Sequence, residues 1–104
     1  MIHVIATITL HAGTRPRFLE LMHNLTPVVL AEQGCIEYGP AIDCASGSPA
    51  QIPLRDDVVT VVEKWSGNEA LAAHAAAPHM KAFGEDAKDY IASVSLQVLT
   101  PSVQ

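Results

Sequence analysis

The hydrophobic pattern divides the first third of the chain into a strand and a helix. Every second position from Ile2 to Leu10 is apolar, which is the period of a strand with one buried face. Residues 15–32 then carry apolar side chains at helical spacing. Pro27 predicts a kink or a break in this helix, and Gly34 predicts its end.

Two more strands and a long connection follow. Residues 35–42 and 58–65 have the apolar and β-branched character of strands, and in the second of them Glu63 and Trp65 share a face with the valines before them. Residues 43–57 between them are rich in Ser, Gly, Pro and Asp and show little periodicity. We therefore expect a long hairpin loop there.

The last third predicts a divided helix and a final strand. Ser66 and Glu69 have the spacing of a capping box, which predicts a helix beginning at Ser66. Pro78 should break this helix, and a second segment should continue to about Asp89. Residues 93–99 alternate in polarity and predict a fourth strand.

The order β-α-β-β-α-β predicts an α+β domain of the ferredoxin-like type, spanning residues 1–104. This fold is a four-stranded antiparallel sheet with both helices on one face, so the other face should be left bare and apolar. The chain has 104 residues, of which 49% are hydrophobic, a large share for so small a body. We therefore expect two copies to pack their sheets together as a homodimer.

Charge and composition exclude several classes of protein. The net charge is −5 with six Lys and Arg in total, which argues against a nucleic-acid partner. No apolar run approaches 18 residues, and the N-terminus lacks the basic region of a signal peptide, so we expect a cytoplasmic protein with no membrane partner. Cys35 and Cys44 lack any zinc or redox spacing and are interpreted as buried free thiols, with a disulfide or a reactive thiol as alternatives.

No motif of a standard cofactor site is present. The chain contains no glycine-rich phosphate loop, no HExxH and no GxSxG. Among five scattered histidines, His74 and His79 are five positions apart with Pro78 between them, which is poor spacing for two metal ligands on one helix face. We therefore predict neither a metal site nor another cofactor.

Four segments carry a resemblance to a known family, and they occur in the family's order: EQGCIEY (32–38), VEKW (62–65), NEALAAH (68–74) and PHMKAF (78–83). Through them nearly the whole chain resembles the antibiotic biosynthesis monooxygenase family. The resemblance implies a dimeric α/β barrel in which each subunit keeps a pocket between its sheet and its helices. It also implies oxidation of a small aromatic substrate, a quinol or a polycyclic phenol, by molecular oxygen without metal or flavin.

The resemblance also implies roles for particular residues. His74 would be the general base that takes a phenolic proton, although a histidine hydrogen-bonded to a strand residue is the alternative. Glu63 could orient His74 or satisfy a buried donor. Trp65 could floor the pocket or simply fill the core. The remaining candidate substrate-binding residues are Tyr38, His79 and Phe83.

Departures from the family pattern leave other functions open. Haem-degrading members place an asparagine in the first strand, and residues 2–10 contain none, which argues against haem. Residues 43–57 form a longer loop than is usual in the family. One alternative is an isomerase of a small phosphorylated compound, which would need cations in its pocket, and Lys64 and Lys81 are the only basic residues near the motifs. The other is a dimeric binding protein without catalysis.

Overall fold

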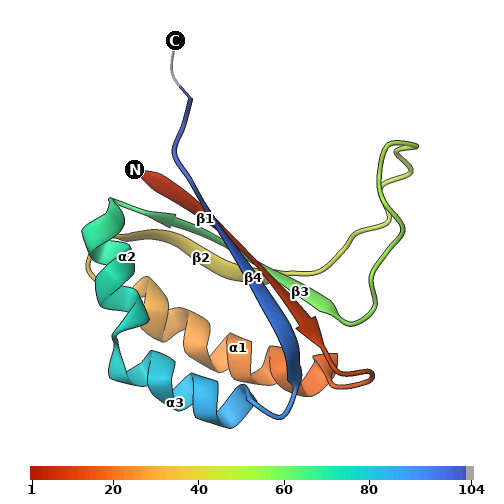
Figure 1. Cartoon of the computed structure of the whole chain (residues 1–104), viewed down its shortest axis with the longest axis horizontal. Helices are drawn as coiled ribbons and strands as arrows, with labels where there is room; N and C mark the ends of the chain where they lie inside the picture. Colours follow the sequence, from red (N-terminus) through yellow and green to blue (C-terminus); the bar gives the residue numbers. More distant parts are fainter. Residues whose placement is uncertain (103–104) are drawn as a thin grey trace.

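The computed structural model describes residues 1–102, and the last two residues of the predicted domain lie outside the described part. The chain forms the predicted ferredoxin-like α+β fold, with the second helix divided at Pro78 (Figure 1). Its elements are β1 (Ile2–Leu10), α1 (Arg15–Leu30), β2 (Cys35–Ala41), β3 (Val58–Trp65), α2 (Asn68–Ala75), α3 (Pro78–Ala87) and β4 (Ile91–Leu99). No helix within residues 1–102 is long and apolar enough to cross a membrane.

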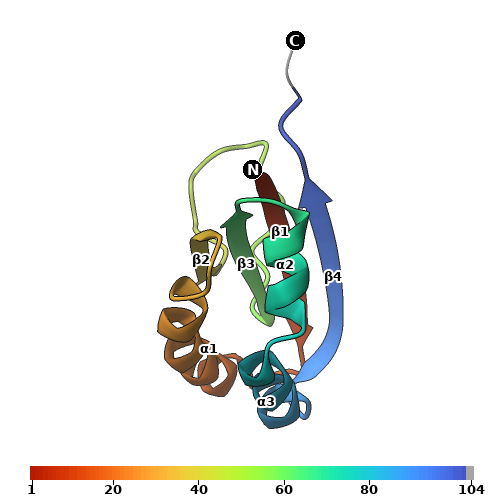
Figure 2. The same cartoon turned by 90° about the vertical axis from the view of Figure 1, so that its left-hand side faces the viewer.

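The four strands form one antiparallel sheet in the order β2-β3-β1-β4, and the helices lie on one side of it (Figure 2). Residues directly opposite each other on neighbouring strands share a face. The register sets Glu63 of β3 opposite both Val4 of β1 and Tyr38 of β2. These three side chains therefore form one row on the helix side of the sheet.

The core lies between this face and the helices. Alternate residues of β1 are buried, as the pattern predicted, and the fully buried Trp65 closes one end of the layer. From α1, one stripe packs onto the sheet: Phe18, Met22, Leu25 and Val29. The helix continues through Pro27 without the predicted break.

The opposite face of the sheet is not the apolar surface that the sequence predicted. Its rows are mostly hydroxyl, amide and charged side chains, because the period of two in β1 sends the threonines there. The register places in these rows Thr7 with Thr60 and Ser95, Ile5 with Val62 and Gln97, and His3 with Lys64 and Leu99. The prediction of a bare apolar face was therefore wrong.

Part of the exposed apolar surface lies instead on the edge strand β4. Val94, Leu96 and Val98 stand opposite Ile8, Ala6 and Val4, so they point to the helix side, yet Val94 and Leu96 are 55% and 57% exposed. The helices pack mainly over β2 and β3 and leave this edge uncovered.

The predicted capping box at Ser66 was also wrong. Helix α2 begins at Asn68, with Gly67 as the residue before it, and no side chain caps it. The Ser66 N–H donates instead to the carbonyl of Gly34 at 2.8 Å, which ties the end of β3 to the turn after α1. Helix α1 ends at Leu30 with Ala31 as its C-cap, earlier than predicted, so Gly34, with φ of +83°, belongs to the turn before β2 and not to the helix end.

The connection of residues 43–57 projects beyond the sheet (Figure 1). An ion pair between Asp43 and Arg55 closes its base. Arg55 Nε and Nη2 donate to the two carboxylate oxygens of Asp43, both at 2.9 Å, and the Arg55 N–H donates to Asp43 as well. Both cysteines are free, but Cys44 in this loop is exposed and Cys35 only half-buried, so the prediction that both are buried was wrong.

Candidate active site

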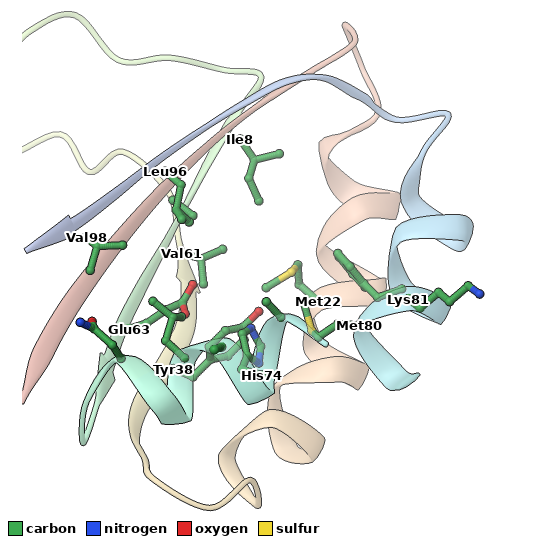
Figure 3. Close-up of a pocket in the computed structure, with 16 residues that line it drawn as sticks. Ile8, Met22, Tyr38, Val61, Glu63, His74, Met80, Lys81, Leu96 and Val98 are labelled. Atoms are coloured by element: carbon green, nitrogen blue, oxygen red, sulfur yellow. The ribbon is translucent and has the colours of Figure 1, made fainter. Parts of the chain in front are cut away.

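A cavity of about 810 Å³ lies between the sheet and the helices (Figure 3). Every strand and helix contributes to its wall, which is apolar except for a few polar side chains. The polar side chains that line it are Tyr38, Glu63, Asn68, His74 and Lys81. A cavity of this size and polarity can hold an aromatic molecule of several rings and position it by a few polar contacts.

His74 reaches this cavity from α2 and is 6% exposed. Its imidazole packs against two aromatic rings, with centroid distances of 4.6 Å to Trp65 and 5.6 Å to Tyr38. These contacts hold the ring in one orientation, since neither neighbour can move without disturbing the core. His74 therefore faces the sheet, although its helix begins two residues later than the sequence predicted.

The partner of His74 is Glu32, which lies in the turn between α1 and β2. The Nδ1 of His74 is 2.8 Å from Glu32 Oε2. Burial raises the pKa of Glu32, but the hydrogen bonds from His74 and His79 outweigh burial, so this pKa lies below its usual value. An ionised carboxylate can only accept, and we therefore assign the Nδ1 proton to His74, which leaves Nε2 as the ring's acceptor.

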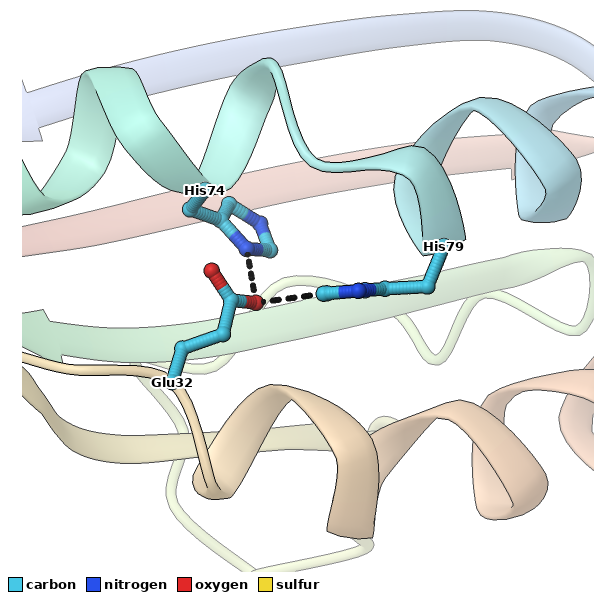
Figure 4. A group of neighbouring side chains, drawn as sticks. All are labelled: Glu32, His74 and His79. Carbon is cyan, nitrogen blue, oxygen red and sulfur yellow. Dashed lines mark hydrogen bonds and ion pairs between the residues drawn. The ribbon is translucent and has the colours of Figure 1, made fainter.

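His79 binds the same carboxylate oxygen. Its Nε2 is also 2.8 Å from Glu32 Oε2, so one oxygen joins two imidazoles (Figure 4). The spacing argument against His74 and His79 meeting was wrong, because the chain leaves α2 after Ala75 and starts a second helix at Pro78. The two rings then approach Glu32 from different helices.

These three residues could also hold a metal ion. One ligand atom from each of Glu32, His74 and His79 lies within 4.8 Å of the others. Two imidazoles and a carboxylate are a common ligand set for transition metals.

One interpretation of the sequence was that Glu63 orients His74, but Glu63 bonds another residue. Its Oε1 accepts the indole N–H of Trp65 at 2.8 Å, which is the alternative of a satisfied buried donor. Burial raises the pKa of Glu63, and the hydrogen bond from Trp65 offsets this only in part. Since Glu63 lines the cavity and is 5% exposed, it presents a polar group in an otherwise apolar wall.

Of the other predicted site residues, two line the cavity and two do not. Tyr38 and Phe83 line the cavity, and burial raises the pKa of Tyr38 well above its usual range, so its phenol stays neutral and can donate. Trp65 is fully buried behind His74 and does not line the cavity, and His79 contacts Glu32 rather than the cavity wall.

Two observations bear on the alternatives from the sequence. Of the two lysines near the motifs, Lys81 lines the cavity, whereas Lys64 lies on the opposite face of the sheet and pairs with Glu37 at 3.0 Å. A phosphate would thus meet one cationic side chain in the cavity wall of the described residues, fewer than a dedicated phosphate site uses.

Sequence reasoning missed Glu32 as a site residue. It lies in the motif EQGCIEY, but no local pattern linked it to the histidines.

The fold and cavity define an α+β protein with a mainly apolar pocket that His74 lines, while Glu32 bonds this histidine from behind the wall. A model of the antibiotic biosynthesis monooxygenase family matches residues 1–86. The chain is 35% identical over 105 residues to "Probable quinol monooxygenase YgiN" of Escherichia coli strain K12, covering 99% of this chain and 100% of that one. The chain belongs to the antibiotic biosynthesis monooxygenase family.

Solved structures agree with the fold. A crystal structure of a Pseudomonas aeruginosa protein has a TM-score of 0.81 at 22% identity, over 98% of this chain and 94% of that one. A structure from Mycobacterium tuberculosis has a TM-score of 0.78 at 21% identity, over 99% and 96%. At these identities the likeness concerns the fold alone.

Proposed function

We propose that this protein is a monooxygenase that oxidises a hydroquinone or a polycyclic phenol with molecular oxygen and needs no metal or flavin. The observation that carries the proposal is the position of His74: its ring lines a large apolar cavity while Glu32 holds its Nδ1 at 2.8 Å. The kinship with a probable quinol monooxygenase supports the same reaction class.

In this mechanism the Nε2 of His74 takes the proton of a substrate hydroxyl. A phenol has a pKa near 10, so an unaided imidazole with a pKa near 6.5 removes its proton only partially. The Glu32 carboxylate stabilises the imidazolium that forms and thereby favours the transfer. The resulting phenolate is rich in electrons and can pass one to oxygen.

The substrate itself supplies the electrons that the reaction needs. A hydroquinone plus O₂ gives a hydroxyquinone plus water, so one oxygen atom enters a ring C–H position and the other leaves as water. Four electrons come from the ring, which is why no external reductant is required. The protein's part is to bind the ring, remove the proton and keep the reacting site dry.

The polar groups in the cavity wall would orient such a substrate. Tyr38 offers a neutral hydroxyl, and Glu63 offers the carboxyl oxygen that Trp65 does not bind. Both lie in the same row of the sheet because Tyr38 and Glu63 are register partners. A flat ring system with an oxygen at each end suits a cavity wall in which polar groups are set apart by apolar side chains.

Oxygen uptake tests this proposal. A panel of benzo- and naphthohydroquinones is mixed with the purified protein in an oxygen electrode, with chelator present, and compared with His74→Gln. We expect kcat on an accepted quinol to fall about 10²–10⁴-fold in the variant, as for the loss of a general base. His23→Gln, an exposed histidine on α1, is the matched control and should retain full turnover. Equal turnover in both variants and the wild type would refute the role of His74.

We further propose that the working form is a homodimer. The support is the uncovered strip Val94, Leu96 and Val98 on β4, which continues the cavity wall, since Leu96 and Val98 also line the cavity. A second copy packed on this strip would remove the apolar side chains from water and shield the open side of the cavity.

A further inference from the structure

Three donor groups from three segments of the chain meet at one point. Glu32 comes from the turn after α1, His74 from the last turn of α2 and His79 from the first turn of α3 (Figure 4). The two ring nitrogens are each 2.8 Å from the same oxygen of Glu32. The proposed oxidation uses His74 and Glu32, and it gives no role to His79.

The chemistry of this cluster, which we call the Glu32 cluster, matches that of a metal site. Imidazole nitrogen and carboxylate oxygen are ligands that Zn²⁺ and other divalent first-row ions bind at about 2.0–2.2 Å. Donors around a tetrahedral ion then stand about 3.3 Å apart, by geometry from those bond lengths. Both ring nitrogens now lie 2.8 Å from the carboxylate oxygen, and all three donor atoms lie within 4.8 Å of one another. Each donor therefore has to shift by only a fraction of an ångström.

The donors are held in place before any ion arrives. The His74 ring is packed against Trp65 and Tyr38. His79 follows Pro78, whose ring fixes the start of α3. The Glu32 N–H donates to the Val29 carbonyl at 2.9 Å and anchors the turn. Binding an ion would therefore cost little ordering of the chain.

The surroundings favour a cation. Glu63, a second buried carboxyl group, lies near enough to Glu32 that the charge of Glu32 contributes to raising the pKa of Glu63. In the described residues no lysine or arginine makes an ion pair with Glu32, whose carboxylate is bonded to the two imidazoles alone. With His79 28% exposed at its side chain, an ion can reach the cluster from solvent.

We propose that Glu32, His74 and His79 form a binding site for one divalent transition-metal ion such as Zn²⁺, with water completing the coordination. The ion takes the ring nitrogen and the carboxylate oxygen that otherwise bond to each other. Metal binding stands on this geometry and does not rest on the proposed oxidation. If the oxidation also holds, the bound ion removes the carboxylate from His74 and inhibits turnover.

Trp65 provides a direct probe of the site. It is the only tryptophan in the chain, and its ring centroid lies 4.6 Å from that of His74. Paramagnetic Co²⁺ bound at His74 should quench its fluorescence, and Zn²⁺, which is not paramagnetic, should restore the fluorescence by competition. The wild-type protein, first treated with chelator, is titrated with Co²⁺ and then with Zn²⁺. We expect saturable quenching with one ion per chain.

Two variants test the ligands, and a third is their control. His79→Gln and Glu32→Gln should each weaken Co²⁺ binding by at least about tenfold, since even outer partners of a metal site contribute that much. His23→Gln, exposed on α1, is the matched control and should bind as the wild type does. Circular dichroism checks that each variant is folded.

A second measurement on the wild type covers the case of a variant that does not fold. In nitrogen-15 NMR of the histidine rings, Zn²⁺ should shift the signals of His74 and His79 and leave those of His3, His11 and His23 in place. Absence of saturable quenching, or ring shifts confined to the other histidines, would overturn the metal site. Quinol oxidation without metal binding, or the reverse, separates this inference from the proposed function.

Discussion

Glu63 is a carboxylate inside an apolar layer, and its burial has an energetic cost. Its pKa in the folded protein lies above the usual value of 4.5, with burial as the first cause. The folded protein therefore holds this proton more tightly than the unfolded chain does. Stability contributed by Glu63 is then greatest below the unfolded pKa and is lost as the pH rises through the folded-state pKa.

Replacement of Glu63 by glutamine should remove this loss. The amide oxygen can still accept the Trp65 indole N–H, and no charge has to be desolvated. We expect Glu63→Gln to unfold at a higher urea concentration than the wild type at pH 7 and at nearly the same concentration at pH 4. Glu37→Gln, an exposed position on β2, should change neither value. An unchanged pH dependence in Glu63→Gln would contradict the account of its burial.

Single residues show where sequence reasoning reached its limit. The resemblance to the family named His74 and Glu63, and both line the cavity. Their partners could not be found that way. Glu32 is 42 positions from His74, and only the packing of the turn after α1 against α2 and α3 brings them together. Glu63 bonds Trp65, two positions away on the same face of one strand, a pairing that the strand period allows.

At the scale of elements, the turn after α1 controls the position of Glu32. Gly34 in this turn has a left-handed conformation, and a β-carbon there would lie 2.6 Å from Ala70 Cβ and 2.7 Å from Ser66 Oγ. The close approach lets the end of β3 and the start of α2 pack directly on the turn.

Gly34→Ala should therefore be costly. The left-handed conformation alone costs a non-glycine residue about 1–2 kcal/mol, and overpacking adds a similar amount, so we expect a loss of about 2–4 kcal/mol in the free energy of unfolding. Gly13→Ala is the control: Gly13 is also left-handed, with φ of +80°, but nothing lies within 4 Å of the added carbon. Denaturant unfolding compares the two. Equal losses would show that the packing around Gly34 does not matter.

The loop of residues 43–57 is tied at its base by the ion pair of Asp43 and Arg55. Hydrogen bonds from Arg55 lower the pKa of Asp43 to about 2. Because this pKa lies below its usual value, the contact with Arg55 persists above the unfolded pKa and is lost as the pH falls through about 2.

Asp43→Asn should loosen this loop at neutral pH. Amide hydrogen exchange of residues 44–54 should become faster in the variant, whereas exchange in β1 and β3 should not change. Asp56→Asn, an exposed neighbour on the same loop, is the matched control. Unchanged exchange in Asp43→Asn would show that the loop is ordered by other contacts.

Element order was the easiest feature to predict, and the faces of the sheet were the hardest. Hydrophobic period and the breakers Gly34 and Pro78 located every strand and helix to within a few residues. The period also places alternate residues on opposite faces, but it does not say which strands the helices cover. The apolar surplus was therefore assigned to the far face, although part of it lies on the helix side of the edge strand β4.

At the scale of the whole molecule, the uncovered strip on β4 should determine whether two copies of the chain form a dimer. If two copies meet there, Val94→Glu places a charge in the interface and should convert the dimer into monomers, because an unpaired charge is costly to bury. Val94 does not line the cavity, so each monomer should keep its fold. Ser95→Glu, on the opposite face of the same strand, is the control. Sedimentation velocity at micromolar concentration measures both, and a monomeric wild type would contradict the proposed dimer.

The central claim is the proposal that this chain inserts an oxygen atom into an aromatic substrate. It is supported by the cavity, the His74–Glu32 pair and the family relationship. Mass spectrometry of the product formed under ¹⁸O₂, by chelator-treated protein acting on an accepted hydroquinone, tests it most directly. The account predicts a hydroxyquinone that contains one ¹⁸O atom, formed at a rate that falls about 10²–10⁴-fold in His74→Gln. A product without ¹⁸O, or one formed equally fast by the variant, would contradict it.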